Sequence, residues 1–389
     1  MKLAIEKKDL INHIMHLASI IPGKITSPIL TNYLIQVDAD SGLMQITASD
    51  LEITVIAQFP ALVQESGVTA VSARHLNEII NSMPDQMVYI NKVDDNLKIQ
   101  CNKIDFNLLC ADHTLFPIIP SRDLSNAYLT SAEEFHRMIA KTAFAVSNDT
   151  NRAVLTGICW QITPDWHLMA ATDGRKVAEI KVPHSPWLNR NAHAVDNDGE
   201  LSVSLGNDSV EKILPVKTVN FLQKVYDSDV KELKIVIENN GFMFAYADYT
   251  VFSHIIEHKY PDYQKAFIHD LPNSVLIDKE ALKTAIKRVS LMSPADNMRI
   301  RFDIDADRFE ISTFNREEGE AKQVLESFSY DGTSANISIN HRFVLSILDA
   351  VDTDKVKLKL GSAKEPLMIY NEQQPESQEI TFLLMPLRS

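Results

Sequence analysis

Apolar residues recur at helical spacing in six segments of the chain, in two alternating kinds. Both kinds have apolar positions at offsets 0, 3, 4 and 7, the stripe of an amphipathic helix. The first kind follows a short extended stretch and begins at Ile11, Phe135 and Leu282; the second ends in a polar turn and begins at Leu76, Thr218 and Val344. The stripes predict helices over 6–20, 72–83, 132–146, 215–226, 278–290 and 340–351.

Between the predicted helices, apolar and polar residues alternate with period two. Such alternation is typical of strands with one buried face, and the short polar links favour antiparallel meanders. Clear examples are Tyr33–Val37, Leu51–Ile56, Leu233–Ile237 and Val356–Leu360. Three segments also resemble one strand-to-strand turn: Ala48–Leu51, Ala171–Gly174 and Ser312–Asn315.

The order of these elements indicates three copies of one module. The two stripes of a module start 65, 83 and 62 residues apart, so the middle copy carries an insertion, predicted as a surface loop over Trp187–Asp208. We therefore predict an α+β fold of three repeated domains, 1–126, 127–272 and 273–389, each with two helices on antiparallel sheets. The alternative is three unrelated α+β domains whose stripes coincide by chance.

Composition changes this picture through its charge. The 389 residues include 38 Lys and Arg against 52 Asp and Glu, a formal net charge of −14, whereas nucleic-acid binders usually carry a basic excess. The six predicted helices nevertheless hold 12 basic and 8 acidic residues, and the rest of the chain holds 26 and 44. This division predicts a mildly basic helical face suited to sequence-independent phosphate contact. The basic residues off the apolar stripes, expected to be exposed, are Lys217, Lys224, Lys283, Lys287 and Arg288.

Motifs that carry chemistry are missing from the sequence. It has no P-loop, GxGxxG, GxSxG or HExxH motif, and its three cysteines show no CxxC spacing. The pairs His13/His16 and His254/His258 lack further ligands, and Asp173 fits a turn cap better than a catalytic carboxylate. We therefore expect no catalytic residue, metal or cofactor. The alternatives kept open are an enzyme built from scattered residues such as Asp173 and His254, and a scaffold that does not bind DNA.

The start of the sequence reaches charged residues too early for a signal peptide, and no run of 18 apolar residues occurs. Together with the unpaired cysteines, these features predict a cytoplasmic protein with no membrane partner.

Four short motifs, in order along the chain, resemble the bacterial DNA polymerase III beta subunits, the replicative sliding clamps. They are Ser27–Leu30, Ala171–Lys176, Tyr260–Tyr263 and Met385–Arg388. The resemblance implies three clamp domains per chain in a head-to-tail homodimeric ring, which encircles duplex DNA without catalysis and gives the replicative polymerase its processivity. It also implies a clamp loader that opens the ring, and repair and translesion polymerases that dock through linear peptide motifs.

The resemblance also implies which residues form each site. The partner-peptide pocket, between the second and third domains, would contain Leu155, Thr172, Gly174, Arg175, Lys176, Val177, Pro261, Lys265, Asn340, Phe343, Pro366, Leu384, Met385, Pro386, Leu387 and Arg388. Core packing is the alternative role for Leu155, Val177 and Leu384. The chain departs from the family at Arg175-Lys176, where His-Arg is commoner, at Lys265, often Arg, and at the terminal Ser389, usually apolar.

Two further sets come from the same resemblance. DNA contact is expected at Lys24, Arg74, Arg152 and Lys217; Asp149 is unfavourable near phosphate, so Lys24, Arg152 and Lys217 are preferred. The dimer interface is expected to join Phe106 and Leu108 of the first domain to Leu291 and Met292 of the third.

Overall fold

The computed structural model describes residues 1–23, 27–119, 124, 127–163, 165–183, 193–195, 201–204, 209–375 and 377–387. The chain forms two compact units. Unit 1 comprises Met1–His136, Ser185–Gly206 and Lys217–Ile255, and unit 2 comprises Arg137–His184, Asn207–Val216 and Ile256–Ser389.

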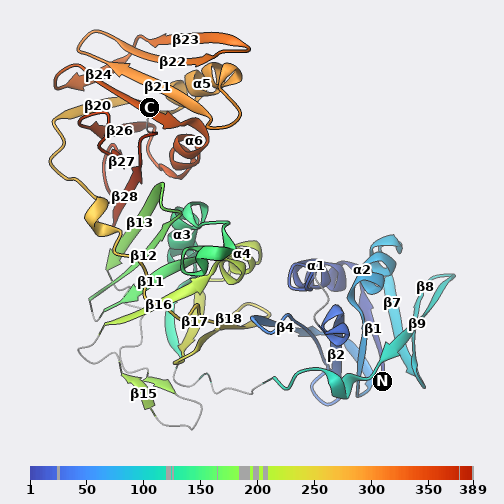
Figure 1. The fold of residues 1–389 in the computed structure, drawn as a ribbon. Helices are drawn as coiled ribbons and strands as arrows, with labels where there is room; N and C mark the ends of the chain where they lie inside the picture. Colours follow the sequence, from blue (N-terminus) through green and yellow to red (C-terminus); the bar gives the residue numbers. More distant parts are fainter. Residues whose placement is uncertain are drawn as a thin grey trace. The chain divides into compact units, whose positions relative to one another are not determined.

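All six predicted helices form. They are α1 (Lys7–Leu17), α2 (Ala73–Ser82), α3 (Ala132–Thr142), α4 (Val216–Lys224), α5 (Lys279–Val289) and α6 (His341–Ala350). Side chains cap several N-termini, as where Asp278 accepts a hydrogen bond from the amide of Ala281. The predicted apolar stripes are buried in α3, α4, α5 and α6, but the stripe predicted for α1 is wrong, because Leu10, Ile14 and Leu17 are buried whereas Met15 and Ala18 are exposed. In unit 1, α1 lies beside α2 (Figure 1).

Unit 1 is built on one sheet of 13 strands, in the order β10-β17-β18-β19-β4-β3-β2-β6-β9-β8-β7-β1-β5. All of its pairings are antiparallel. Its strands are β1 (Lys2–Glu6), β2 (Asn32–Asp38), β3 (Leu43–Ser49), β4 (Ile53–Pro60), β5 (Leu62–Glu65), β6 (Gly67–Ser72), β7 (Met87–Val93), β8 (Asn96–Cys101), β9 (Ile104–Ala111), β10 (Tyr128–Ser131), β17 (Glu232–Ile237), β18 (Gly241–Tyr246) and β19 (Tyr249–His254).

Unit 2 holds a nine-stranded sheet, β16-β11-β12-β13-β28-β27-β26-β20-β24, and a four-stranded sheet, β23-β22-β21-β25 (Figure 1). The strands are β11 (Gly157–Ile162), β12 (Trp166–Thr172), β13 (Lys176–Pro183), β16 (Val210–Pro215), β20 (Asn273–Asp278), β21 (Arg299–Ile304), β22 (Phe309–Asn315), β23 (Gly319–Leu325), β24 (Phe328–Asp331), β25 (Ala335–Asn340), β26 (Lys355–Leu360), β27 (Leu367–Asn371) and β28 (Glu379–Leu384).

The strand order repeats three times, as the sequence pattern predicts. Four strands follow one another as β4-β3-β2-β6, as β13-β12-β11-β16 and as β23-β22-β21-β25. The three copies are joined in the same way, because β4 pairs with β19 and β13 pairs with β28. This α+β architecture of antiparallel sheets with few helices is the predicted fold class.

Three further local predictions are wrong. Leu51 and Glu52 precede β4 instead of belonging to it, because Leu51 has a φ of 76°, which no strand residue adopts. Ser312–Asn315 lies inside β22, and the turn begins only at Asn315, whose side chain accepts the amide of Glu317. Within the predicted loop Trp187–Asp208, β14 (His193–Val195) and β15 (Leu201–Ser204) form a hairpin, which the alternation of Leu and Val with Ser signals.

Candidate partner-binding site

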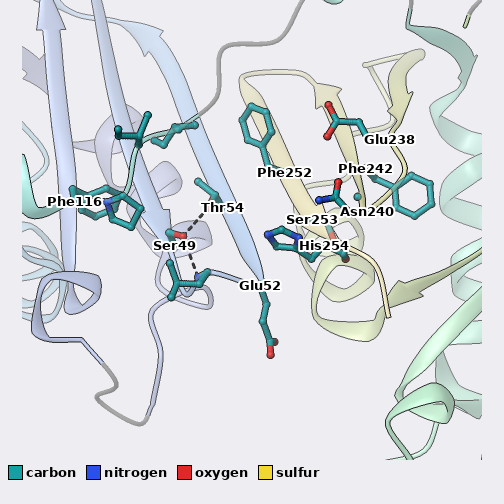
Figure 2. A pocket seen from close by; sticks show the side chains of 15 residues that line it. Ser49, Glu52, Thr54, Phe116, Glu238, Asn240, Phe242, Phe252, Ser253 and His254 are labelled. Carbon is teal, nitrogen blue, oxygen red and sulfur yellow. Dashed lines mark hydrogen bonds between the residues drawn. The ribbon is translucent and has the colours of Figure 1, made fainter. Parts of the chain in front are cut away.

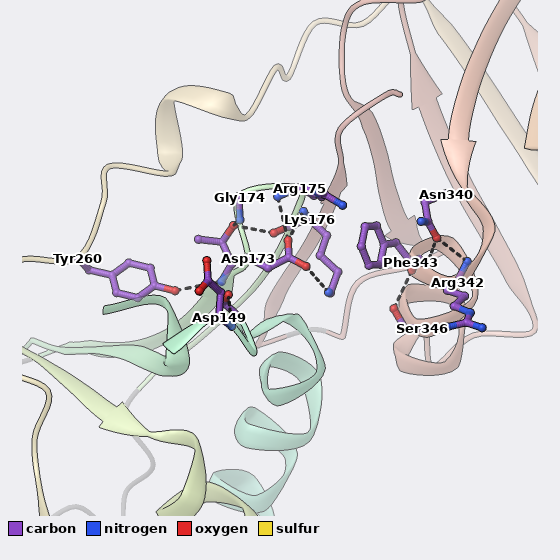
Figure 3. A network of polar contacts seen from close by, with 12 residues as sticks. Asp149, Asp173, Gly174, Arg175, Lys176, Tyr260, Asn340, Arg342, Phe343 and Ser346 are labelled. Atoms are coloured by element: carbon purple, nitrogen blue, oxygen red, sulfur yellow. Dashed lines mark hydrogen bonds and ion pairs between the residues drawn. The ribbon is translucent and has the colours of Figure 1, made fainter. Parts of the chain in front are cut away.

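The turn between β12 and β13, in unit 2, is fixed by the side chain of Asp173. Its Oδ1 accepts hydrogen bonds from the amides of Arg175, at 2.8 Å, and Lys176, at 2.9 Å (Figure 3). Thr172 Oγ1 accepts the amide of Gly174 at 3.0 Å, and Gly174 has a φ of 84°, which favours glycine. Asp173 is thus the turn cap that the sequence predicts, and its carboxylate stabilises the turn by accepting backbone amides.

Lys176 is buried at the centre of this region. Its Nζ lies 2.6 Å from Asp173 Oδ2 and 4.4 Å from the centroid of the Phe343 ring, a cation–π distance (Figure 3). The side chain of Lys176 is only 7% exposed and that of Asp173 14%, so little water reaches either charge and each is stabilised by the opposite charge of the other. The ring of Phe343 comes from α6, whose N-terminus Asn340 caps by accepting the amides of Arg342 and Phe343. Lys176 therefore links the β12–β13 turn to α6.

The segment before the third module is attached to the same sheet by two tyrosines. Tyr260 Oη accepts the amide of Thr172 at 3.0 Å, and the Tyr263 hydroxyl donates to Glu179 Oε2 at 2.5 Å. Both tyrosines belong to a hydrophobic cluster with Leu155, Val177 and Leu383. The motif Tyr260–Tyr263 forms this attachment, and neither tyrosine is among the residues predicted for the site, which include Pro261 of the motif.

The end of the chain borders the turn. The amide of Met385 donates to the carbonyl of Arg175 at 2.8 Å, and the amide of Leu387 donates to the carbonyl of Ser338 at 2.8 Å. The side chain of Met385 is 39% exposed, and Pro386 and Leu387 are half-buried. Arg388 lies outside the described residues.

The predicted pocket residues divide by exposure. Leu155, Thr172, Val177, Pro366 and Leu384 are buried, and Leu384 has no exposed surface. Leu155 and Val177 pack in the hydrophobic cluster, which agrees with the alternative of core packing. The exposed members are Gly174, Arg175, Pro261, Lys265 and Met385. Lys265 forms an ion pair with Asp262 at 2.8 Å.

Arg152, predicted to contact DNA, lies beside this turn. A Cβ placed on Gly174 would be 3.1 Å from Nη1 of Arg152. Its Nε also pairs with Asp149 Oδ2 at 3.2 Å, and both side chains are about half exposed. The structure therefore brings Arg152 together with the predicted partner residues, which spacing along the sequence does not signal.

The other predicted DNA residues lie in unit 1. Arg74, in the first turn of α2, is exposed and pairs with Glu78 at 2.9 Å. Lys217 of α4 forms an ion pair with Asp50, and its Nζ lies 3.4 Å from the carbonyl of Ile20. Lys24 lies outside the described residues.

The expectation that all basic residues off the helix stripes are exposed is wrong in part. Lys287, Arg288 and Lys224 are exposed. Lys283 is only 14% exposed because it pairs with Glu280 and, at 2.8 Å, with Asp349 of α6. Lys217 is half-buried in its pair with Asp50. Acidic residues of the helices, Glu280 and Asp349, and the turn residue Asp50 thus neutralise part of the positive charge on the helical face.

The predicted interface residues lie at two strand edges. Phe106 and Leu108 are half-buried on β9, whose residues 104–109 pair with β8. Leu291 is 80% exposed directly after α5, and Met292 is half-buried. Beside Met292 runs β23, which ends its sheet and pairs only with β22 among the described strands.

The Asp173–Lys176 pair gives a stability prediction. Asp173→Ala should lower the free energy of unfolding by about 2–4 kcal/mol, because it leaves the buried ammonium of Lys176 unpaired and removes a carboxylate that accepts two amides. Asp173→Asn retains the Oδ1 acceptor and should cost less. Urea unfolding measures both. The control is Asp112→Ala, which removes an exposed turn cap that forms no ion pair with the described residues. An equal loss in Asp112→Ala would contradict the prediction.

The Glu179 carboxyl gives a pH prediction. Burial raises its pKa above the usual range, although the Tyr263 hydroxyl opposes this shift. The folded protein therefore holds this proton more tightly than the unfolded chain, so the contribution of Glu179 to stability is full in acid and falls as pH rises through the raised pKa. Glu179→Gln should gain stability relative to the parent from pH 4 to pH 8, measured by urea unfolding. A gain that shrinks with pH, or that exposed Glu379→Gln reproduces, would refute this assignment.

No helix among the described residues is long and apolar enough to span a membrane.

The histidine pair His13/His16 forms hydrogen bonds within unit 1. The rings of both residues contact the Tyr249 hydroxyl through Nδ1, at 2.9 and 2.7 Å.

Three models of one family match the chain in order. They are the N-terminal domain of the DNA polymerase III beta subunit over residues 1–120, the central domain over 130–195 and 199–262, and the C-terminal domain over 265–388. Curated proteins named beta sliding clamp, from Caulobacter vibrioides and Staphylococcus aureus, are 25% identical over the full length of both chains. Solved beta subunits share the fold: those from Bartonella birtlesii and Bacillus subtilis have TM-scores of 0.89 and 0.88 at 22% and 23% identity, covering all of this chain and at least 99% of theirs.

Proposed function

This chain belongs to the DNA polymerase III beta subunit family, and from that membership we propose how it works as a sliding clamp on DNA. It is a DNA sliding clamp, a processivity factor without catalysis that serves DNA replication. The observation that carries this conclusion is that the three family models follow one another along the chain where the same strand order occurs three times.

The strand pairing supports closure of two chains into a ring. Within the chain, β19 pairs with β4 and β28 pairs with β13, and β9 is the corresponding strand of the first module. On β9 of the first module, β6 pairs only with Cys110 and Ala111, so one edge of residues 104–109 is open, as is one edge of β23 in the third module. Pairing of these two edges between copies would give a head-to-tail homodimer. We assign the modules to 1–126, 127–272 and 273–389. Phe106, Leu108, Leu291 and Met292 would supply the apolar contact beside the paired strands.

Encirclement explains how a chain with a net charge of −14 and only a weakly basic helical face can hold DNA. A ring that surrounds duplex DNA stays bound without strong contacts, and a strongly basic inner surface would slow sliding along the phosphates. Lys24, Arg74 and Lys217 are our proposed DNA contacts. The Asp50 carboxylate on Lys217 reduces the charge available to phosphate. Arg152 is proposed to serve the partner site instead, since it lies beside Gly174.

The partner site is proposed to bind extended peptide segments of other proteins. The exposed side chains of Arg175 and Met385 lie beside buried apolar residues, an arrangement that suits an apolar anchor and a few polar contacts. The replicative polymerase is the principal partner. The clamp loader and the repair and translesion polymerases are expected to use the same residues, and the protein is expected to act in the cytoplasm.

Primer extension on singly primed circular DNA tests this function. The protein, loaded by a clamp loader with ATP, should convert short polymerase products into products thousands of nucleotides long, because a tethered polymerase does not dissociate between additions. Omitting the loader should abolish this change for the same protein. Unchanged product length with loader and ATP present would contradict the proposal.

A further inference from the structure

The β3–β4 turn of unit 1 repeats the β12–β13 turn of the candidate partner site. Asp50 Oδ1 accepts the amides of Glu52 and Ile53, at 3.0 and 2.8 Å, as Asp173 accepts those of Arg175 and Lys176. Ser49 Oγ accepts the amide of Leu51 at 3.2 Å, as Thr172 does for Gly174. The two turns thus share one backbone design.

The strand beside each turn is also equivalent. The amide of His254, at the end of β19, donates to the carbonyl of Glu52 at 2.9 Å. In unit 2, the amide of Met385, just after β28, donates to the carbonyl of Arg175 at 2.8 Å. By this register Glu52 corresponds to Arg175 and His254 to Met385. The first turn therefore has the same neighbours as the candidate partner site.

A pocket of about 270 Å³ lies at this turn, entirely within unit 1. Three segments line it: the β3–β4 turn with the strand residues beside it, the extended chain at 116–119, and the β17–β18 turn with the adjacent ends of β18 and β19. Phe116 enters from one side, and Phe252 and His254 enter from the other (Figure 2). Its volume suits one or two side chains of a bound peptide.

The rim of the pocket is apolar and acidic. Leu51 is 56% exposed and Ile118 is 95% exposed, which is costly for large apolar side chains unless something covers them. Glu52 also lines the pocket, and none of the described residues that line it is Lys or Arg. The exposed Glu52 carboxylate forms no ion pair within the described part of the chain, so it favours a ligand with positive charge.

The backbone at Leu51 is a second, independent observation. Leu51 has a φ of 76°, which disfavours a side chain, whereas the corresponding residue of the other turn is Gly174 with a φ of 84°. Leu51 is thus a leucine in an unfavourable backbone conformation whose side chain is exposed at the rim of a pocket. This combination indicates that the side chain contacts a ligand.

We propose that this pocket is a second docking site, which binds a short extended peptide of a partner protein carrying an apolar or aromatic side chain next to Lys or Arg. The apolar side chain would contact Leu51, Phe116 and Phe252, and the basic side chain would pair with Glu52. The idea that this turn binds a peptide rests on the proposed function of the equivalent β12–β13 turn. The expected preference for a positively charged peptide rests on the pocket itself.

Methyl NMR on the full-length protein tests the proposal, with ¹³C labels on the methyl groups of Ile, Leu and Met. The probe is the capped pentapeptide acetyl-Lys-Leu-Phe-Lys-Gly-amide, and the matched control has Glu in place of both Lys. We expect the lysine peptide to shift the Leu51 and Ile118 signals saturably and the glutamate peptide to bind about tenfold more weakly or not at all. Met385 reports binding at the other turn.

Two variants sharpen the test. Glu52→Gln should weaken binding of the lysine peptide about threefold, since a rim ion pair contributes modestly. Leu51→Gly should remove apolar contact while relieving the backbone, so it will fold. Equal affinity for both peptides, no shift at Leu51 and Ile118, or shifts at Met385 alone would overturn the proposal. The last result would leave docking at the partner site intact.

Discussion

Leu291→Ala combined with Met292→Ala is expected to convert the dimer into monomers. Leu291 is 80% exposed in the single chain, and both residues lie beside the edge strand β23. Truncating two apolar anchors at an interface costs about 2 kcal/mol or more. A head-to-tail ring of two chains contains the interface twice, so the loss doubles, which corresponds to about a thousandfold weaker dimer.

Sedimentation equilibrium measures this change directly through the mass of the particle. Leu62→Ala is the matched control, because Leu62 is 65% exposed on β5, away from β9 and β23 in the strand order. The control should remain a dimer at the concentration at which the double variant is a monomer. An unchanged dimer mass for the double variant would refute the assigned interface.

Deletion of the residues from Met385 onward is expected to abolish partner docking while leaving the dimer intact. The deletion begins after β28, so strand pairing with β13 is retained, but it removes the exposed Met385 and the contacts of its amide and that of Leu387. Loss of a central apolar anchor typically weakens binding about 30-fold or more.

Surface plasmon resonance with the immobilised replicative polymerase measures this loss. Met15→Ala is the control, because Met15 is an equally large apolar side chain, 57% exposed on α1. Sedimentation of the truncated chain must show a dimer for the comparison to hold. Affinity equal to that of the parent would exclude the chain end from the partner site.

Sequence patterns predicted the helices, most strands and the threefold repeat because these depend on local periodicity. Leu282, Ala285, Ile286 and Val289 are buried on one face of α5 as their spacing predicts. In α1 the buried face is formed by Leu10, Ile14 and Leu17 instead of the stripe predicted from Ile11. The start of β4 was missed because the positive φ of Leu51 has no signal in residue type; a glycine there, as at position 174, would have indicated it.

Contacts between distant segments were beyond prediction from the sequence. Lys283 is neutralised by Asp349, and Lys217 by Asp50, across separations that no local pattern specifies. The position of Arg152 beside Gly174 likewise depends on how two loops meet in space. The other site residues could be predicted only from the resemblance to the family. The turn-capping role of Asp173 follows from its residue type and position in the sequence, and the structure confirms it.

Encirclement of DNA is the central claim, and linearisation of a loaded circle tests it most directly. The protein is loaded onto nicked circular DNA with a clamp loader and ATP, separated from free protein, and then divided into an intact and a linearised sample. A ring held by topology should remain on the intact circle and leave the linear molecule through its ends within minutes. Equal retention on both forms, or equal loss from both, would contradict encirclement.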